Sequence, residues 1–255
     1  MHVIGITGAI GHGKSTLAKY LLDDVGSGRI IETSEDIVSV ANNWLRFLPE
    51  SLKTNPPGYE LLNDWIDSLA DVIRREGLGD INAKKLHVSE LQIESREQSI
   101  LKLLEYLENI RTGTVASNEI IGAHNKDNHR PILQWIGGYL VKHYHEGIWF
   151  DAINKKIQQA GSDGLKLTLV CGVRFLYDMK VIKDNQGVVV KIERPSTMVA
   201  DSNEVTEKER AYLTPDTTVL NDSGLNALHE TAKVLYDDIS SKHLLEKYVC
   251  SDFAD

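Results

Sequence analysis

One stretch near the start of the chain has the residue types and the spacing to bind nucleotide phosphates. Residues 8–16, Gly-Ala-Ile-Gly-His-Gly-Lys-Ser-Thr, fit the pattern G-x-x-x-x-G-K-[ST]. Glycines in such a loop let backbone N–H groups converge on an anion, and the helix behind adds the partial positive charge of its N-terminus. Lys14 is expected to reach the β- and γ-phosphates of ATP, and the Ser15 hydroxyl to ligate Mg²⁺. The predicted donor site consists of Gly8, Gly11, His12, Gly13, Lys14, Ser15 and Thr16.

A loop of this kind works only where it leaves a strand and opens a helix, and both flanks fit. Residues 3–7 are apolar and rich in β-branched side chains, as expected of a buried parallel strand. After the loop, apolar residues recur at helical spacing from Leu17 to Val25, and Gly26-Ser27-Gly28 ends the run. The flanks therefore predict a strand, a phosphate-binding loop and a helix in succession.

Further apolar runs predict the strands of an α/β core with a parallel sheet. These runs are residues 29–32, 165–171, 188–193 and 217–220, and helical patterns separate them. Open parallel sheets bind ligands beyond the carboxyl ends of their strands. Polar residues that follow the predicted strands are therefore candidate ligand groups, and they are Glu32, Ser34, Asp36 and Arg174.

The polar residues after the second predicted strand allow two interpretations. Glu32, Ser34 and Asp36 have the chemistry to bind an acceptor, to act as a base or to assist a metal ion. Alternatively, Ser34 or Asp36 simply caps the helix that begins there. The sequence does not decide between these roles.

The middle of the chain differs in residue pattern from the predicted α/β core, and this pattern predicts a helical insertion. Residues 49–125 contain the breaker Asn55-Pro56-Pro57-Gly58 and two runs with apolar residues at helical spacing. We expect this insertion either to cover a substrate or to form a homodimer, and residues 1–48 with 126–255 to form the core. Residues 195–213 are polar and charged, which is typical of a lid, and Arg210 within them is a candidate phosphate ligand.

Composition narrows the class of protein. The 255 residues are 42% hydrophobic and 25% charged, as in ordinary globular proteins, and the formal net charge of −9 argues against a surface for non-specific DNA binding. Cys171 and Cys250 are far apart and lack metal-type spacing, which favours a reducing compartment. The first predicted strand leaves no room for a signal peptide, and no apolar run reaches membrane length. We expect a cytoplasmic protein without membrane contact.

The order of these motifs resembles that of the P-loop nucleoside monophosphate kinases, and among them the bacteriophage-type deoxynucleoside monophosphate kinases. The phosphate loop is specific, whereas the later motifs are persuasive mainly because they occur in the same order. Most of the core is covered, and the helical insertion matches weakly. The residues that carry the resemblance are 8–16, Arg130-Pro131-Ile132-Leu133-Gln134 with Gly137, Trp149, Val173-Arg174-Phe175 with Asp178, 190–195 and Leu220-Asn221-Asp222.

The resemblance implies a three-layer α/β/α P-loop kinase core with a helical substrate-binding subdomain. It also implies that Arg130 and Gln134 face the acceptor nucleotide, and that Arg174 lies near the acceptor or the transferred phosphate. Arg194 and Asn221 would lie on the base side of the donor nucleotide. A phage-encoded chain of this family would act in the host cytoplasm.

Two positions depart from the family pattern. Gly172 stands where the family usually carries an aspartate before the Val-Arg pair, so a Walker B-like carboxylate is missing there. Ile37 falls where the family tends to have a lysine near the second strand. The first departure concerns Mg²⁺ positioning, and the second concerns the identity of the acceptor.

These features predict in-line transfer of the γ-phosphoryl group of ATP to a deoxynucleoside monophosphate, with Mg²⁺ as cofactor. Such transfer depends on positioning and charge neutralisation more than on covalent help from the protein. Arginine holds phosphate oxygens bidentately, which lysine does less well. A carboxylate such as Asp36 or Glu32 would orient the acceptor. The residues expected to carry catalysis are Lys14, Arg130, Arg174 and Asp36, with Glu32, Ser34, Gln134 and Arg210 binding the substrate.

Three other functions compete with this prediction. Phage relatives of these kinases phosphorylate 5-hydroxymethyluracil within DNA during thymine hypermodification, and the altered acceptor-side residues suit that reaction. Dephospho-coenzyme A kinases have a loop similar to Thr7-Gly8-Ala9-Ile10-Gly11, although the later motifs fit them less well. A nucleotide-binding protein without catalysis would explain Gly172, but Lys14 and Ser15 are intact.

Overall fold

The structure is a computed structural model, and it describes all residues except 56–58, 79–92, 144–146, 197–209 and 251–255. The chain divides into two compact units. Unit 1 comprises Met1–Thr33 and Ile153–Asp255, and unit 2 comprises Ser34–Ala152. The predicted insertion, residues 49–125, lies inside unit 2, which also takes in the helices on either side of it.

The described part of unit 1 is built on a six-stranded sheet in which every pairing is parallel. The fold is therefore α/β, as the sequence predicts. The strand order is β2-β3-β1-β4-β5-β6. The strands are β1 (His2–Thr7), β2 (Gly28–Glu32), β3 (Leu167–Cys171), β4 (Val188–Glu193), β5 (Thr217–Leu220) and β6 (Lys247–Val249).

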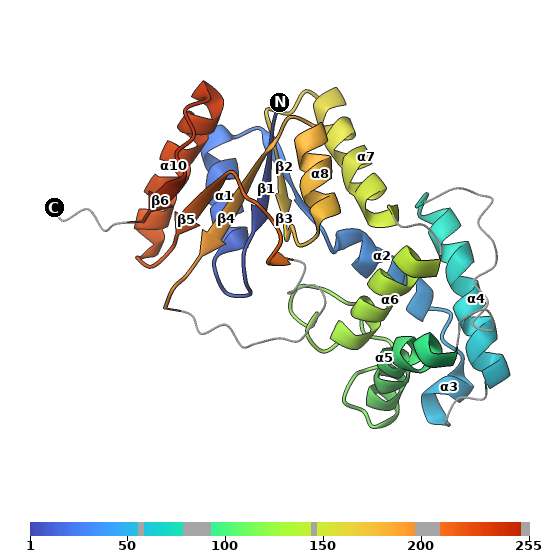
Figure 1. The fold of residues 1–255 in the computed structure, drawn as a ribbon. Helices are drawn as coiled ribbons and strands as arrows, with labels where there is room; N and C mark the ends of the chain where they lie inside the picture. Colours follow the sequence, from blue (N-terminus) through green and yellow to red (C-terminus); the bar gives the residue numbers. More distant parts are fainter. Residues whose placement is uncertain (56–58, 79–92, 144–146, 197–209, 251–255) are drawn as a thin grey trace. The chain divides into compact units, whose positions relative to one another are not determined.

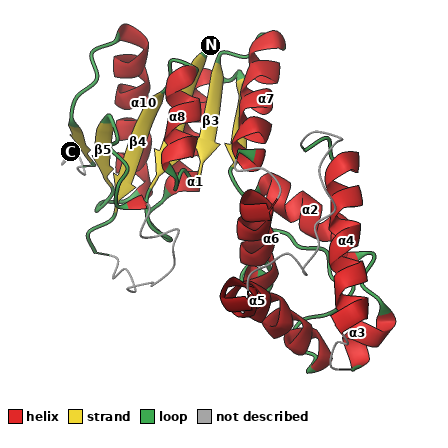
Figure 2. Ribbon diagram, turned by 45° about the vertical axis from the view of Figure 1, so that its right-hand side comes forward, coloured by secondary structure: helices red, strands yellow, loops and turns green. Residues whose placement is uncertain are grey.

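Helices cover both faces of this sheet (Figure 1; Figure 2), and the side chains of β1, β2, β3 and β4 alternate between two cores. Ile4 and Ile6 of β1 pack toward α1 and α10, whereas Val3 packs toward α8 and the part of α7 that begins at Ile153. Gly5 lets α8 approach closely, because an added Cβ would lie 2.1 Å from Ile182 Cδ1. The helices are α1 (Lys14–Val25), α7 (Ile148–Ser162), α8 (Leu176–Asp184) and α10 (Leu225–Ser241).

The strand order places a topological switch point at the carboxyl end of β1. From β1 the chain first builds β2 and β3 on one side, and it then crosses to build β4, β5 and β6 on the other. Parallel sheets bind ligands at such points, in the crevice outside the carboxyl ends of the strands. The loop that leaves β1 therefore begins where this architecture most often places a binding site.

Unit 2 is helical and has its own apolar core. Four stacked aromatic rings lie in it. Trp44 stacks on Trp65 with ring centroids 4.0 Å apart, and also on Trp135, which stacks in turn on Tyr139. All four side chains are buried, so their large apolar area stabilises the unit. The helices are α2 (Glu35–Leu45), α3 (Glu50–Thr54), α4 (Tyr59–Arg75), α5 (Ile93–Arg111) and α6 (Arg130–His143).

The structure corrects two details of the expected helices. Apolar residues recur at helical spacing over residues 130–160, which predicts one helical stretch, but α6 ends at His143 and α7 begins at Ile148. Ser223 precedes the last helical pattern and its residue type predicts an N-cap, whereas Gly224 is the N-cap and the Ser223 hydroxyl donates to the Cys250 carbonyl at 2.7 Å. Strand β6, which the sequence did not suggest, explains this second difference because it brings Cys250 next to β5.

Most of the predicted lid lies outside the described residues, since 197–209 fall within the expected 195–213. No described helix is long and apolar enough to cross a membrane. Both cysteines are free and buried, and burial raises the pKa of the Cys171 thiol to about 12. Cys171 is accordingly a small core residue, as its place in a buried strand predicts.

Candidate functional site

The predicted phosphate loop connects β1 to α1, so it has the strand and the helix that its chemistry needs. Gly8, Gly11 and Gly13 have positive φ angles of 151°, 81° and 101°. An alanine Cβ at Gly8 would lie only 2.4 Å from the Ile192 carbonyl oxygen. The glycines are therefore required by backbone conformation and by close approach to the end of β4.

Lys14 and Ser15 open helix α1 behind this loop. The Lys14 ammonium lies over the loop, where Nζ donates to the carbonyls of Gly8 at 2.9 Å and Ala9 at 2.8 Å. Ser15 and Thr16 occupy the first turn, whose N–H groups have no partner within the helix. The start of α1 thus provides N–H groups and an ammonium that suit a polyphosphate, and hydroxyls that suit its metal ion.

Arg194 and Asn221, both expected near the donor nucleotide, follow the ends of β4 and β5 and meet the loop at His12. The Arg194 backbone N–H lies 3.3 Å from His12 Nδ1, and Asn221 Nδ2 donates to the His12 carbonyl at 2.9 Å. The pKa of His12 lies below the ordinary histidine value, mainly because the side chain is buried. The hydrogen bond to the Ile192 carbonyl raises this pKa, whereas the charges of Lys14 and Arg210 lower it. The His12 side chain is thus neutral at pH 7.

The other candidates in unit 1 lie at the same edge of the sheet. Glu32 ends β2 and is exposed, and Arg174 follows β3 and is half-buried. The Asp178 carboxylate accepts the backbone N–H groups of Arg174 and Phe175, at 2.8 and 3.1 Å, and so fixes the start of α8. Arg210, the one lid arginine within the described residues, is half-buried near His12.

Gly172 is a glycine because of its backbone conformation and its close neighbours. Its φ angle is +87°, and an added Cβ would lie 2.8 Å from Thr33 Oγ1. Thr33 in turn donates its hydroxyl proton to the Gly172 carbonyl at 2.9 Å. A side chain at this position would be strained, which accounts for a glycine, rather than the expected aspartate, just after β3.

The acceptor-side candidates lie in unit 2, at the starts of α2 and α6. Ser34 is the N-cap of α2 but makes no side-chain capping bond, and Asp36 lies in the first turn. Arg130 is the first residue of α6 and forms an exposed ion pair with Asp127, 2.6 Å long. An exposed ion pair of this kind contributes little stability. The Arg130 guanidinium can therefore leave Asp127 and bind a phosphate at little cost in free energy.

Gln134 and Ile37 complete the acceptor-side positions. Gln134 lies one helical turn after Arg130 on α6, and its Oε1 accepts from Lys102 Nζ of α5. Ile37 packs against the apolar core of unit 2, and its Cδ1 lies 3.3 Å from the position of a Cβ on Gly137. Ile37 is thus a packing residue that lies against α6.

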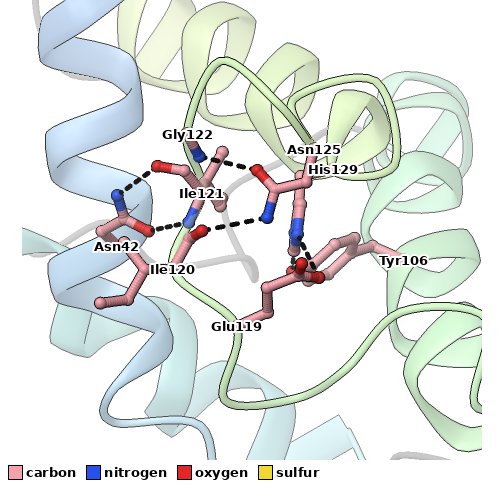
Figure 3. Close-up of polar contacts among 8 residues, drawn as sticks. All are labelled: Asn42, Tyr106, Glu119, Ile120, Ile121, Gly122, Asn125 and His129. Carbon is pink, nitrogen blue, oxygen red and sulfur yellow. Dashed lines mark hydrogen bonds and ion pairs between the residues drawn. The ribbon is translucent and has the colours of Figure 1, made fainter.

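Sequence reasoning missed the loop that precedes α6. Lys126 Nζ donates to Ser34 Oγ, which brings an ammonium group to the start of α2. Asn42 pairs with both backbone groups of Ile121, at 3.0 and 2.8 Å (Figure 3). Asn125 accepts from the Gly122 N–H and donates to the Ile120 carbonyl. These partners are far apart in sequence, so no local pattern reveals them.

A buried histidine closes this network (Figure 3). His129 is completely buried, its Nδ1 lies 2.8 Å from the Tyr106 hydroxyl, and its Nε2 lies 3.4 Å from Glu119 Oε2. The two contacts are consistent with a neutral ring that accepts at Nδ1 and carries its proton on Nε2. The network holds the loop that carries Lys126 and leads into Arg130.

Burial lowers the pKa of His129, while the hydrogen bond and the charge of Glu119 raise it. Below the ordinary histidine pKa the unfolded chain therefore takes up a proton that the folded chain does not, and stability is lost as pH falls. We expect the stability gap between the parent chain and His129→Gln to narrow by about 1 kcal/mol between about pH 7.5 and 5.5. Urea unfolding at both pH values measures it.

Tyr106→Phe is the matched control, because it removes the hydroxyl partner and keeps the imidazole. Its stability deficit should be similar at both pH values. If His129→Gln loses stability with falling pH in parallel with the parent chain, His129 does not contribute to the pH dependence.

Comparison with models of protein families finds none that matches the chain, and comparison with curated proteins finds no match either. The function of the chain must therefore be inferred from its motifs and from the geometry of the site.

Proposed function

We propose that this chain is an ATP-dependent phosphotransferase with a three-layer P-loop kinase core, and that it phosphorylates a deoxynucleoside monophosphate. The main observation behind the proposal is the conformation and residue content of the loop of residues 8–16. It combines three glycines of positive φ, a lysine over the loop and a helix N-terminus, at the switch point of a parallel sheet. Each feature alone is common, whereas their combination suits a polyphosphate donor.

In this proposal, Lys14 and the first turn of α1 neutralise the donor phosphates. The Ser15 hydroxyl would hold Mg²⁺, which supplies further charge neutralisation when bound. Arg174 and Arg210 carry positive charges that would stabilise the phosphoryl group during its transfer, and both residues belong to unit 1, as the loop does. Asp36 or Glu32 would orient the acceptor oxygen for in-line attack.

The residues proposed to bind the acceptor lie mainly in unit 2. Arg130 and Gln134 share one face of α6, and Lys126 joins Ser34 at the start of α2. Together these groups offer two cations, an amide and a hydroxyl, which suit a nucleoside monophosphate with one phosphate and one base. A helical unit with its own core provides a rigid support for them.

A second acceptor, 5-hydroxymethyluracil in DNA, is favoured by a different observation. Tyr177 and Tyr212 are exposed, with 46% and 72% of their surface accessible, and Arg174 and Arg210 lie within three residues of them. Aromatic rings beside cations bind single-stranded nucleic acid by stacking and by charge. The net charge of −9 weighs against this alternative.

An acceptor screen tests the proposal and separates it from its competitors. The purified chain is supplied with Mg²⁺ and ATP, and ADP release is measured with each deoxynucleoside monophosphate, with dephospho-coenzyme A and with DNA containing 5-hydroxymethyluracil. We expect release with a deoxynucleoside monophosphate. ADP release only with the modified DNA or only with dephospho-coenzyme A would show that this compound is the acceptor instead. ATP binding without any transfer would show that the chain is a nucleotide-binding protein without catalysis.

A further inference from the structure

His12 stands out within the phosphate loop because its side chain is buried. Only 7% of the residue is exposed, whereas Ile10, two positions earlier, is 62% exposed. Its Nε2 is buried and has no hydrogen-bond partner among the described residues. Burying an imidazole costs free energy unless its contacts compensate, so this placement calls for an explanation.

The His12 ring contacts the end of β4. Nδ1 lies 3.3 Å from the Ile192 carbonyl oxygen and 3.3 Å from the Arg194 backbone nitrogen. A neutral ring with its proton on Nε2 accepts the Arg194 N–H, and the other tautomer donates to the Ile192 carbonyl. In either tautomer one hydrogen bond ties the loop to the strand that neighbours β1.

The His12 backbone makes a second connection, to the end of β5. Its carbonyl accepts from Asn221 Nδ2 at 2.9 Å, and the Asn221 backbone N–H donates to the Glu193 carbonyl at 2.7 Å. The next loop residue, Gly13, also presses against Asn221, since an added Cβ would lie 2.6 Å from Nδ2. Asn221 is thus held by β4 and in turn holds the loop.

A phosphate loop depends on such support. Its glycines have large conformational freedom, and ordering them only when the ligand binds would reduce affinity. A loop that is already fixed presents its N–H groups without that entropic cost, which is the advantage of preorganisation. Contacts made from behind the loop can supply it without occupying the surface that faces the ligand.

We propose that His12 is a positioning residue, which holds the loop in its phosphate-binding form through its imidazole and through its carbonyl bond to Asn221. The inference rests on the proposed function of the loop as the donor site. His12 touches neither the acceptor nor the reacting atoms in this role. Its loss should therefore weaken ATP binding and leave acceptor binding and the chemical step nearly unchanged.

The test compares His12→Leu, His12→Asn and Asn221→Ala in steady-state kinetics. We expect His12→Leu and Asn221→Ala to raise the KM for ATP about tenfold, the effect of one lost hydrogen bond, with kcat and the acceptor KM changed less than about twofold. Asparagine places an amide oxygen near the position of Nδ1, so His12→Asn should recover most of the affinity. A merely structural role would not separate KM for ATP from kcat in this way.

His2→Leu is the matched control, because it replaces a histidine at the other end of β1 with the same residue. It should leave all three constants unchanged. An unchanged KM for ATP in His12→Leu overturns the inference alone, provided that the parent chain binds ATP, whereas a parent chain that does not bind ATP overturns the proposed function as well. If His12→Leu does not fold, His12→Asn must outperform His12→Gln, which places its amide near Nε2 instead.

Discussion

Replacing Lys14 by alanine should reduce phosphoryl transfer by at least about a hundredfold, as the loss of one preorganised charge at a developing anion does in other enzymes. Its ammonium lies over the loop, held by the Gly8 and Ala9 carbonyls, so it is in place before any ligand arrives. No other described side chain of the loop carries a positive charge at pH 7. Initial rates of ADP release with saturating acceptor measure the loss.

Lys19→Ala is the matched control for this variant. Lys19 lies on the same helix and is exposed, so its loss removes one positive charge without touching the loop. Its rate should stay within about twofold of the parent chain, and both variants should unfold at similar temperatures. Retention of transfer in Lys14→Ala would remove the loop from the mechanism.

Replacing Gly13 by alanine should also have a large effect. The residue has a φ of +101°, and the new Cβ would lie 2.6 Å from Asn221 Nδ2. The chain must either accept strain of about 1–3 kcal/mol or move the loop away from Asn221. Both responses disturb the N–H groups at the start of α1, so we expect ATP affinity to fall more than about tenfold. Calorimetric titration with ATP and Mg²⁺ measures this change.

Gly26→Ala provides a close comparison. Gly26 also has a positive φ, of 65°, at the other end of the same helix, but nothing lies within 4 Å of its added Cβ. It should therefore cost about 1 kcal/mol of stability and leave ATP affinity unchanged. Equal effects of the two substitutions on ATP binding would show that crowding by Asn221 does not matter.

The local part of the site could be predicted from the sequence, because its determinants are local. Glycine spacing, a β-branched run before the loop and helical periodicity after it lie within about one βα unit, and the structure confirms the strand and the helix. The other core strands were also predictable, since each is a short apolar run. Parallel pairing then brings Glu32, Arg174 and Arg194 to one edge of the sheet without further information.

The remaining features depend on contacts that sequence patterns do not encode. Asn221 meets His12 across 209 positions, and Lys126 meets Ser34 across 92. No sequence pattern marks His129, which the fold buries against Tyr106. A short strand such as β6, at the edge of the sheet, has too few residues to show a pattern. Tertiary structure decides these positions.

The proposed function requires that residues 8–16 bind the phosphates of ATP. Nuclear magnetic resonance tests it most directly, because backbone amide shifts report which N–H groups meet the ligand. Titration with ATP and Mg²⁺ should shift the amide signals of Gly11, Gly13, Lys14 and Ser15 most strongly, and adenosine without phosphates should leave them in place. Saturable ATP binding with the largest shifts elsewhere in the chain, or no binding at all, would show that residues 8–16 are not the ATP site.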